Sequence, residues 1–161
     1  MDRQDDGPRH AAPDWVLVAN AGRARCFARD PANQALKELH DFVHPASRLP
    51  GSSLGTDRGG QVRKSAASTQ FAPHTDPHKK EQALFAAELA AWLEDAACQR
   101  QFPRLALIAS AALLGELRAH LGSNTRHLLG ASVALDLTQF DGAELERRVA
   151  QALQGMAEPP A

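Results

Sequence analysis

The residues of this sequence that are best suited to chemistry lie in one short stretch, TDRGGQVRKS, at positions 56–65. Gly59 and Gly60 permit positive φ angles and allow the backbone to approach a substrate without a side-chain clash. Gln61 could orient a water molecule, or donate a hydrogen bond to a developing oxyanion through its backbone N–H. An amide does not titrate near neutral pH, so Gln61 cannot act as a general base. Any catalysis by this tripeptide must therefore come from positioning.

Basic residues surround the tripeptide. Between positions 45 and 80 the chain has six Lys or Arg residues and two Asp residues, a net charge of +4, whereas the whole chain has −1. Such a cluster favours an anionic partner, because Lys and Arg bind phosphate groups. The predicted phosphate-binding residues are Arg58, Arg63, Lys64, Lys79 and Lys80. The alternative is a flexible, solvated loop whose glycines and charges only keep it soluble.

Other chemistry has weaker support in the sequence. A two-metal nuclease needs an inward carboxylate on its first strand, and the predicted strand WVLVAN has none. His74 and His78 are four residues apart but lack the further ligands of a zinc site. Ser110 follows a predicted strand without a Gly-x-Ser-x-Gly motif, so we interpret it as a helix N-cap. We therefore expect no metal and no cofactor.

Three strands are predicted first, and they must position the basic stretch. A short apolar run at 15–20 indicates a buried strand, and alternating patterns at 23–30 and 36–43 predict two partners in an antiparallel meander. A stretch of about thirty residues then follows, rich in Pro, Gly, Ser and Thr and without periodicity. Loops of that length in compact domains are usually functional or disordered.

The second half of the chain alternates helices and strands. Asp76 and Pro77 indicate a helix start, and Phe85, Leu89, Trp92 and Ala96 follow at helical spacing. The next elements are predicted as a buried strand at 104–110, a helix with Leu114, Leu117 and Leu121 on one face, and a strand within 127–138. Asp141 and Glu144 predict a capping box for the last helix, whose apolar face includes Val149.

Length and composition indicate one domain. A chain of 161 residues with 43% hydrophobic content can form an ordinary core, predicted at 14–154, with flexible tails at 1–13 and 155–161. No apolar run approaches the roughly 20 residues of a membrane span. Cys26 and Cys98 lack the spacing of a zinc or redox motif, and both are predicted to be buried thiols. We expect a soluble, cytoplasmic protein without a membrane partner.

Several segments together resemble a known bacterial family, the proteins required for attachment to host cells. The resemblance runs from about Trp15 to Val149 and rests on four segments: WVLVANAGRARCF, HDFVHP, TDPHKKE and LDLT. That family is in turn similar to the catalytic middle domain of archaeal and eukaryotic class-one release factors. The resemblance implies an α/β fold like that of ribonuclease H, with a mixed five-stranded sheet in the order βββαβαβα. It also implies a long loop between the third strand and the first helix.

In the release-factor domain that loop presents Gly-Gly-Gln, which Gly59, Gly60 and Gln61 match here. The resemblance thus implies association with the ribosome or tRNA, and hydrolysis of the peptidyl-tRNA ester. Release factors have separate domains for codon reading and partner binding, and we expect neither in this chain of 161 residues. A non-enzymatic binding protein with a role in attachment, as the family name implies, remains the alternative, and a homo-oligomer remains open.

Overall fold

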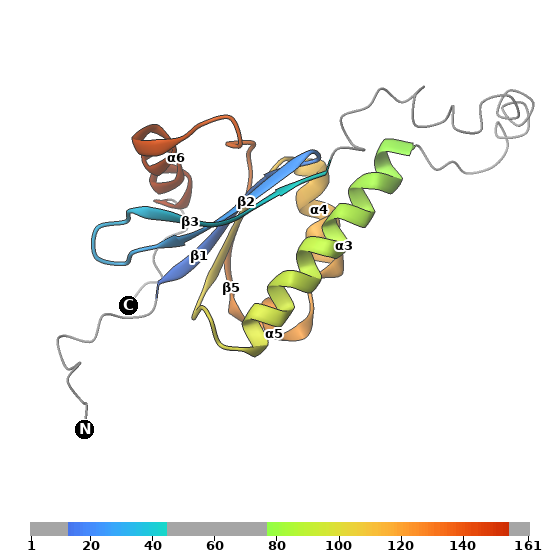
Figure 1. The fold of residues 1–161 in the computed structure, drawn as a ribbon, viewed down its shortest axis with the longest axis horizontal. Helices are drawn as coiled ribbons and strands as arrows, with labels where there is room; N and C mark the ends of the chain where they lie inside the picture. Colours follow the sequence, from blue (N-terminus) through green and yellow to red (C-terminus); the bar gives the residue numbers. More distant parts are fainter. Residues whose placement is uncertain (1–12, 45–76, 155–161) are drawn as a thin grey trace, which may run out of the picture.

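The structure is a computed structural model, and it describes residues 13–44 and 77–154 (Figure 1). Its first three strands form the predicted antiparallel meander, in which β2 pairs with both β1 and β3. The turn after β1 is tight, since Asn20 at the strand end pairs with Arg23 at the start of β2. The strands are β1 (Asp14–Asn20), β2 (Arg23–Arg29) and β3 (Leu36–Val43).

The remaining elements add two parallel strands to the other side of β1. β4 pairs with β1 and β5 pairs with β4, both in parallel, so the sheet order is β3-β2-β1-β4-β5. The mixed five-stranded α/β sheet expected from the sequence is thus confirmed. The elements are α3 (Pro77–Cys98), β4 (Leu105–Ala109), α4 (Ala111–His120), α5 (Ser123–Leu128), β5 (Leu129–Ala134) and α6 (Gly142–Gln154).

Helices cover both faces of the sheet, with α3, α4 and α5 on one side and α6 on the other (Figure 1). Successive side chains of a strand point to opposite faces, so β1 contributes to two cores. Trp15 and Leu17 pack in the larger core with α3 and α4, whereas Val16 and Val18 pack in the smaller core with α6. Apolar residues on both faces explain why WVLVA reads as a continuous apolar run.

The helix α5 was not predicted, because its six residues SNTRHL show no apolar periodicity. A carboxylate from another helix stabilises its N-terminus. Glu94 of α3 accepts hydrogen bonds from the backbone N–H groups of Asn124 (3.3 Å) and Thr125 (2.9 Å). Their side chains also donate to Glu94, at 2.7 and 2.8 Å. Hydrogen bonds from Thr125 and Asn124 lower the pKa of Glu94 to about 2.

Two predictions from the sequence are wrong. Cys26 is buried as expected, but Cys98 is exposed. The predicted capping box of α6 does not form, because Arg147 and Arg148 take the Glu144 carboxylate and Asp141 lies 3.4 Å from the guanidinium of Arg25.

Candidate functional site

The two ends of the basic segment meet at one point of the fold. His44 directly follows β3, and its Nε2 lies 2.8 Å from a carboxylate oxygen of Glu81 on α3. The His44 ring also stacks on Phe85, with 4.7 Å between centroids and 17° between planes. Both side chains of the His44–Glu81 pair are largely shielded, at 16% and 25% exposure. These contacts fix the positions of the two residues that flank the basic stretch at 45–80.

Two of the predicted phosphate-binding residues lie beside this junction. Lys79 and Lys80 are exposed near the start of α3. The next residue, Glu81, directs its carboxylate to His44. The first turn of α3 has no acidic side chain, so the partial positive charge of the helix N-terminus adds to that of the two lysines. We call this group, formed by His44, Lys79, Lys80, Glu81 and Phe85, the segment base.

The other predicted site residues fall between the two described parts of the chain. The proposed catalytic tripeptide and the remaining basic residues lie outside the described residues, as do Asp76 and His74. The predicted site residues in this position are Arg58, Gly59, Gly60, Gln61, Arg63 and Lys64. Of the predicted site, the structure therefore brings together only the two lysines of α3.

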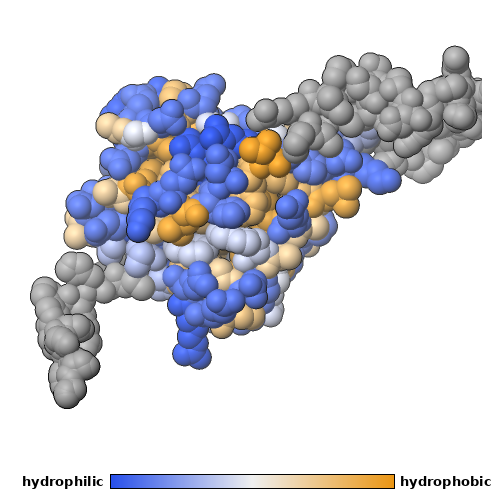
Figure 2. All heavy atoms as spheres, in the orientation of Figure 1, coloured by the Kyte–Doolittle hydropathy of each residue, from blue (hydrophilic) through white to orange (hydrophobic). Residues whose placement is uncertain are grey.

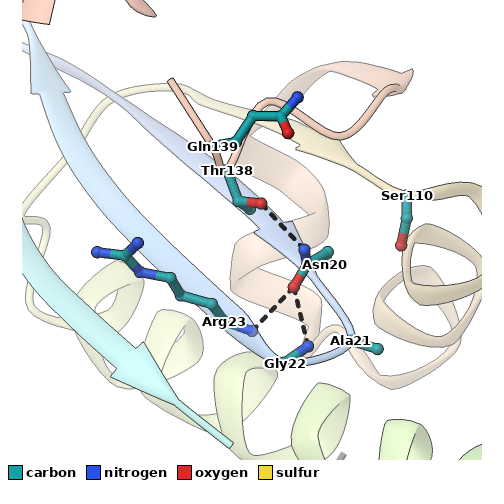
Figure 3. Close-up of a pocket in the computed structure, with 7 residues that line it drawn as sticks. All are labelled: Asn20, Ala21, Gly22, Arg23, Ser110, Thr138 and Gln139. Atoms are coloured by element: carbon teal, nitrogen blue, oxygen red, sulfur yellow. Dashed lines mark hydrogen bonds between the residues drawn. The ribbon is translucent and has the colours of Figure 1, made fainter. Parts of the chain in front are cut away.

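A second candidate site is a hollow at the carboxyl ends of β1 and β4, of about 540 Å³ (Figure 3). Ligands of open α/β sheets commonly bind at this end of the strands. The turn between β1 and β2 forms one side of the hollow, and Ser110, Thr138 and Gln139 line the rest. The Arg23 side chain extends away from Ser110, and Asp41 of β3 accepts both of its hydrogen bonds, at 3.0 and 3.1 Å.

Asn20 organises this hollow. Its side-chain oxygen accepts hydrogen bonds from the backbone N–H groups of Gly22 (2.9 Å) and Arg23 (3.0 Å), which fixes the turn. Its amide nitrogen donates to Thr138 at 3.0 Å (Figure 3). It also donates to Asp136 at 3.0 Å, and the two bonds tie β1 to the chain after β5. The sequence indicates the turn, since Asn before Ala-Gly is typical of a turn that the Asn side chain stabilises. We had not predicted the longer-range contacts.

The carboxylate of Asp136 also has a structural role. Burial acts to raise its pKa, but hydrogen bonds from Thr138 and Asn20 outweigh that effect and lower the pKa. Thr138 donates from both its backbone N–H (3.0 Å) and its hydroxyl (2.6 Å), so the Asp136 carboxylate stabilises the turn after β5. Within residues 13–44 and 77–154, no three His, Cys, Asp or Glu residues come together as metal ligands.

Ser110 occupies the predicted N-cap position of α4, yet its side chain makes no capping hydrogen bond. It lies across the hollow from Thr138 and Gln139 (Figure 3). A hydroxyl and the amide of Gln139 can hydrogen-bond a small polar molecule, but neither is a general base at neutral pH. The described residues that line the hollow therefore offer polar contacts and no acid–base pair.

The fold and these two sites define an α/β domain with a basic insertion between β3 and α3. The family model of the "Protein required for attachment to host cells" matches residues 15–149, and the chain belongs to this family. No curated protein matches the chain. It is similar to a chain of the solved "PilM-PilN type IV pilus biogenesis complex", at 17% identity and a TM-score of 0.38. That match covers 91% of this chain and 48% of the other, so this chain spans about half its length. No described helix has the length and apolar character to cross a membrane.

Proposed function

We propose that this protein binds structured RNA, as part of the ribosome or as tRNA, through the basic stretch at positions 45–80. The observation that carries the proposal is the segment base, where the His44–Glu81 contact joins the two ends of the stretch beside the exposed Lys79 and Lys80. A stretch held at both ends in this way can direct several cations at one phosphate backbone.

Charge also supports an anionic partner. The stretch has a net charge of +4, so the rest of the chain has −5, and an RNA would contact the basic part alone. Each phosphate neutralised by Lys or Arg releases counterions, which makes such binding weaken as salt concentration rises. The face in Figure 2 is mainly hydrophilic with separate apolar spots, a surface that suits a polar partner.

The test is a titration of fluorescent ribosomal RNA and of tRNA at several salt concentrations. Double replacement of Lys79 and Lys80 by Ala should weaken binding and lower the slope of log affinity against log salt by roughly one for each lysine. Triple replacement of Arg58, Arg63 and Lys64 should weaken it further. Lys37→Ala, at an exposed position of β3 away from the segment base, is the matched control and should change little.

Binding that does not change between low and moderate salt would remove the electrostatic basis of the proposal. An equal loss of affinity in Lys37→Ala would show that the net charge of the protein matters more than the stretch.

A second proposal concerns catalysis by Gly59, Gly60 and Gln61, and their match to the release-factor tripeptide supports it. Because the tripeptide has no titratable base, the surrounding ribosomal site would have to supply most of the transition-state stabilisation. The protein should then release nascent peptide from ribosomes while hydrolysing little free peptidyl-tRNA. Gly60→Ala should abolish release, and Gln61→Ala should reduce it less if the donor is the backbone N–H.

Absence of peptide release by the wild-type protein would favour the alternative, a non-enzymatic binding protein that acts in attachment to host cells. The family description supports that alternative. RNA binding without release would keep the first proposal and reject only the catalytic one.

A further inference from the structure

The two edges of the sheet differ in how they are protected. β3 forms one edge, and it has four charged or titratable side chains among its eight residues, in the sequence LKELHDFV. The β2–β3 register also shifts between Cys26 and Phe27, which is a bulge. Charged side chains and bulges are the usual means by which proteins prevent an edge strand from pairing with another chain.

β5 forms the other edge, and it lacks the charged side chains that protect β3. Its sequence LGASVA contains no charged residue and no proline. Gly130 and Ala134 are exposed within the strand, and Leu135 directly after it is 43% exposed. Like β3, β5 contains one extra residue, since Leu129 pairs with Leu105 and Ala131 with Ala106, and Gly130 lies between them.

The backbone groups that point outward can be assigned. The N–H of Leu135 donates to the carbonyl of Ala109 in β4, at 2.8 Å. Because backbone groups alternate along a strand, the N–H groups of Ser132 and Ala134 point away from β4. Among the described strands only β4 pairs with β5, so these groups form an open edge for another strand.

We propose that the β5 edge pairs with β5 of a second copy of this chain, in antiparallel orientation, to give a continuous ten-stranded sheet. The ends of the strand are complementary in charge for this arrangement. Arg126 and His127 precede β5 and Asp136 follows it, and all three are exposed. Arg126 donates to two backbone carbonyls and Asp136 accepts from Asn20 and Thr138, and these neutral partners fix the two charges in place without cancelling them. Antiparallel pairing with Ser132 on the two-fold axis brings the basic end of each protomer to the acidic end of its partner. A parallel arrangement would instead place like charges together.

This inference is independent of RNA binding. The segment base lies at the end of β3, and β3 and β5 are the opposite edges of the sheet. A dimer through β5 would leave both basic stretches accessible. It would also present two of them to one large RNA.

Sedimentation velocity of the full chain tests the proposal. We expect a concentration-dependent species of twice the 17.3 kDa mass of one chain. Ala134→Pro removes an outward N–H and takes none from the β4 ladder, so it should raise the dimer dissociation constant roughly tenfold or more. Ala134→Lys places a charge on the edge and should also raise the dimer dissociation constant. His127→Glu should weaken the dimer by bringing like charges together at each end.

Leu39→Lys, at the exposed centre of the opposite edge, is the matched control and should leave the dimer intact. Circular dichroism and thermal melting establish that each variant is folded. A chain that stays monomeric at about 0.1 mM overturns the proposal, whether its β5 edge stays bare or pairs with another protein. A dimer that persists in both folded Ala134 variants, or that Leu39→Lys disrupts, also overturns it.

Discussion

The two faces of the sheet are stabilised in different ways. On one face, the strands, the helices α3 and α4 and the chain next to them contribute twenty of the described buried residues to a continuous apolar core. On the other face, α6 covers a core of eight buried residues. The smaller face depends on a polar contact as well, since Arg25 of β2 is only 7% exposed and contacts groups of β3 and of the chain before α6.

Arg25 connects the smaller face to the chain before α6. Its guanidinium donates to the carbonyl of Phe140 at 2.9 Å and lies 3.2 Å from the carboxylate of Glu38. It also lies 5.0 Å from the ring centre of Phe27. The larger face thus has a continuous apolar core with its polar contacts at the periphery, whereas the smaller face combines a thin apolar layer with one buried cation.

The largest expected effect compares the same substitution on the two faces. Leu93 on α3 and Leu145 on α6 are both buried, at 0% and 1% exposure. Leu93→Ala should lower the free energy of unfolding by about 4 kcal/mol, and Leu145→Ala by about 2 kcal/mol, because the thinner layer can collapse around the lost atoms. Urea unfolding monitored by tryptophan fluorescence measures both. Equal losses would show that the two cores are equally rigid.

Removal of the buried cation should have the next largest effect. Arg25→Met keeps much of the side-chain volume but leaves the Phe140 carbonyl without its donor, and should cost about 2 kcal/mol of stability. Arg23→Met is the matched control, since its ion pair with Asp41 is exposed at 37% and 41% and should contribute less than about 1 kcal/mol. If both variants lose the same stability, Arg25 has no special role in the smaller face.

On the larger face, a variant of Glu94 should differ from wild type in melting temperature, by an amount that depends on pH. Hydrogen bonds lower the pKa of Glu94 from the usual 4.5 to about 2. The stability that the ionised Glu94 carboxylate gives the folded protein is therefore complete above pH 4.5 and is lost as pH falls toward 2. Glu94→Gln should therefore lower the melting temperature at pH 7, and the difference from wild type should narrow below pH 4.5. Melting curves at several pH values measure this. A difference that stays constant down to pH 2 would contradict the assigned cause.

The smallest expected effect concerns two helical glycines. A Cβ at Gly115 of α4 would meet no atom within 4 Å, so Gly115→Ala should stabilise the protein by about 0.5–1 kcal/mol. Gly142 at the start of α6 has φ +52°, where an L side chain is strained, so Gly142→Ala should destabilise it. Thermal melts should show a higher melting temperature for Gly115→Ala and a lower one for Gly142→Ala. Stabilisation by both would mean that the start of α6 relaxes to another conformation.

Most of the fold could be predicted because periodicity reflects burial. β3 begins and ends at the predicted residues, and the predicted start of α3 at Pro77 is confirmed. The six residues of α5 could not be predicted, because the Glu94 carboxylate that stabilises them is about thirty positions away in the chain. The predicted capping box of α6 does not form for a related reason. Arg25, which is far away in the sequence, lies 3.4 Å from the Asp141 carboxylate.

The candidate site could be predicted only in part. The exposed position of Lys79 and Lys80 follows from their place near the start of an amphipathic helix. The contact of His44 with Glu81 could not be predicted, because it depends on how closely β3 approaches α3. Trp92 was predicted as a core residue and is partly buried, since it stacks with Trp15 and His40 near the edge strand.

The parallel pairing of β1 with β4 imposes a delay during synthesis. β1 is made first, but β4 begins about 85 positions later, after the meander, the segment 45–76 and α3. At translation rates of 5–20 residues per second, the wait is roughly 4–17 s. For that time one side of the apolar strand β1 has no partner, and such unpaired edges are prone to aggregate. Lengthening the chain between His44 and Pro77 should therefore lower the yield of folded protein without changing any contact within the sheet.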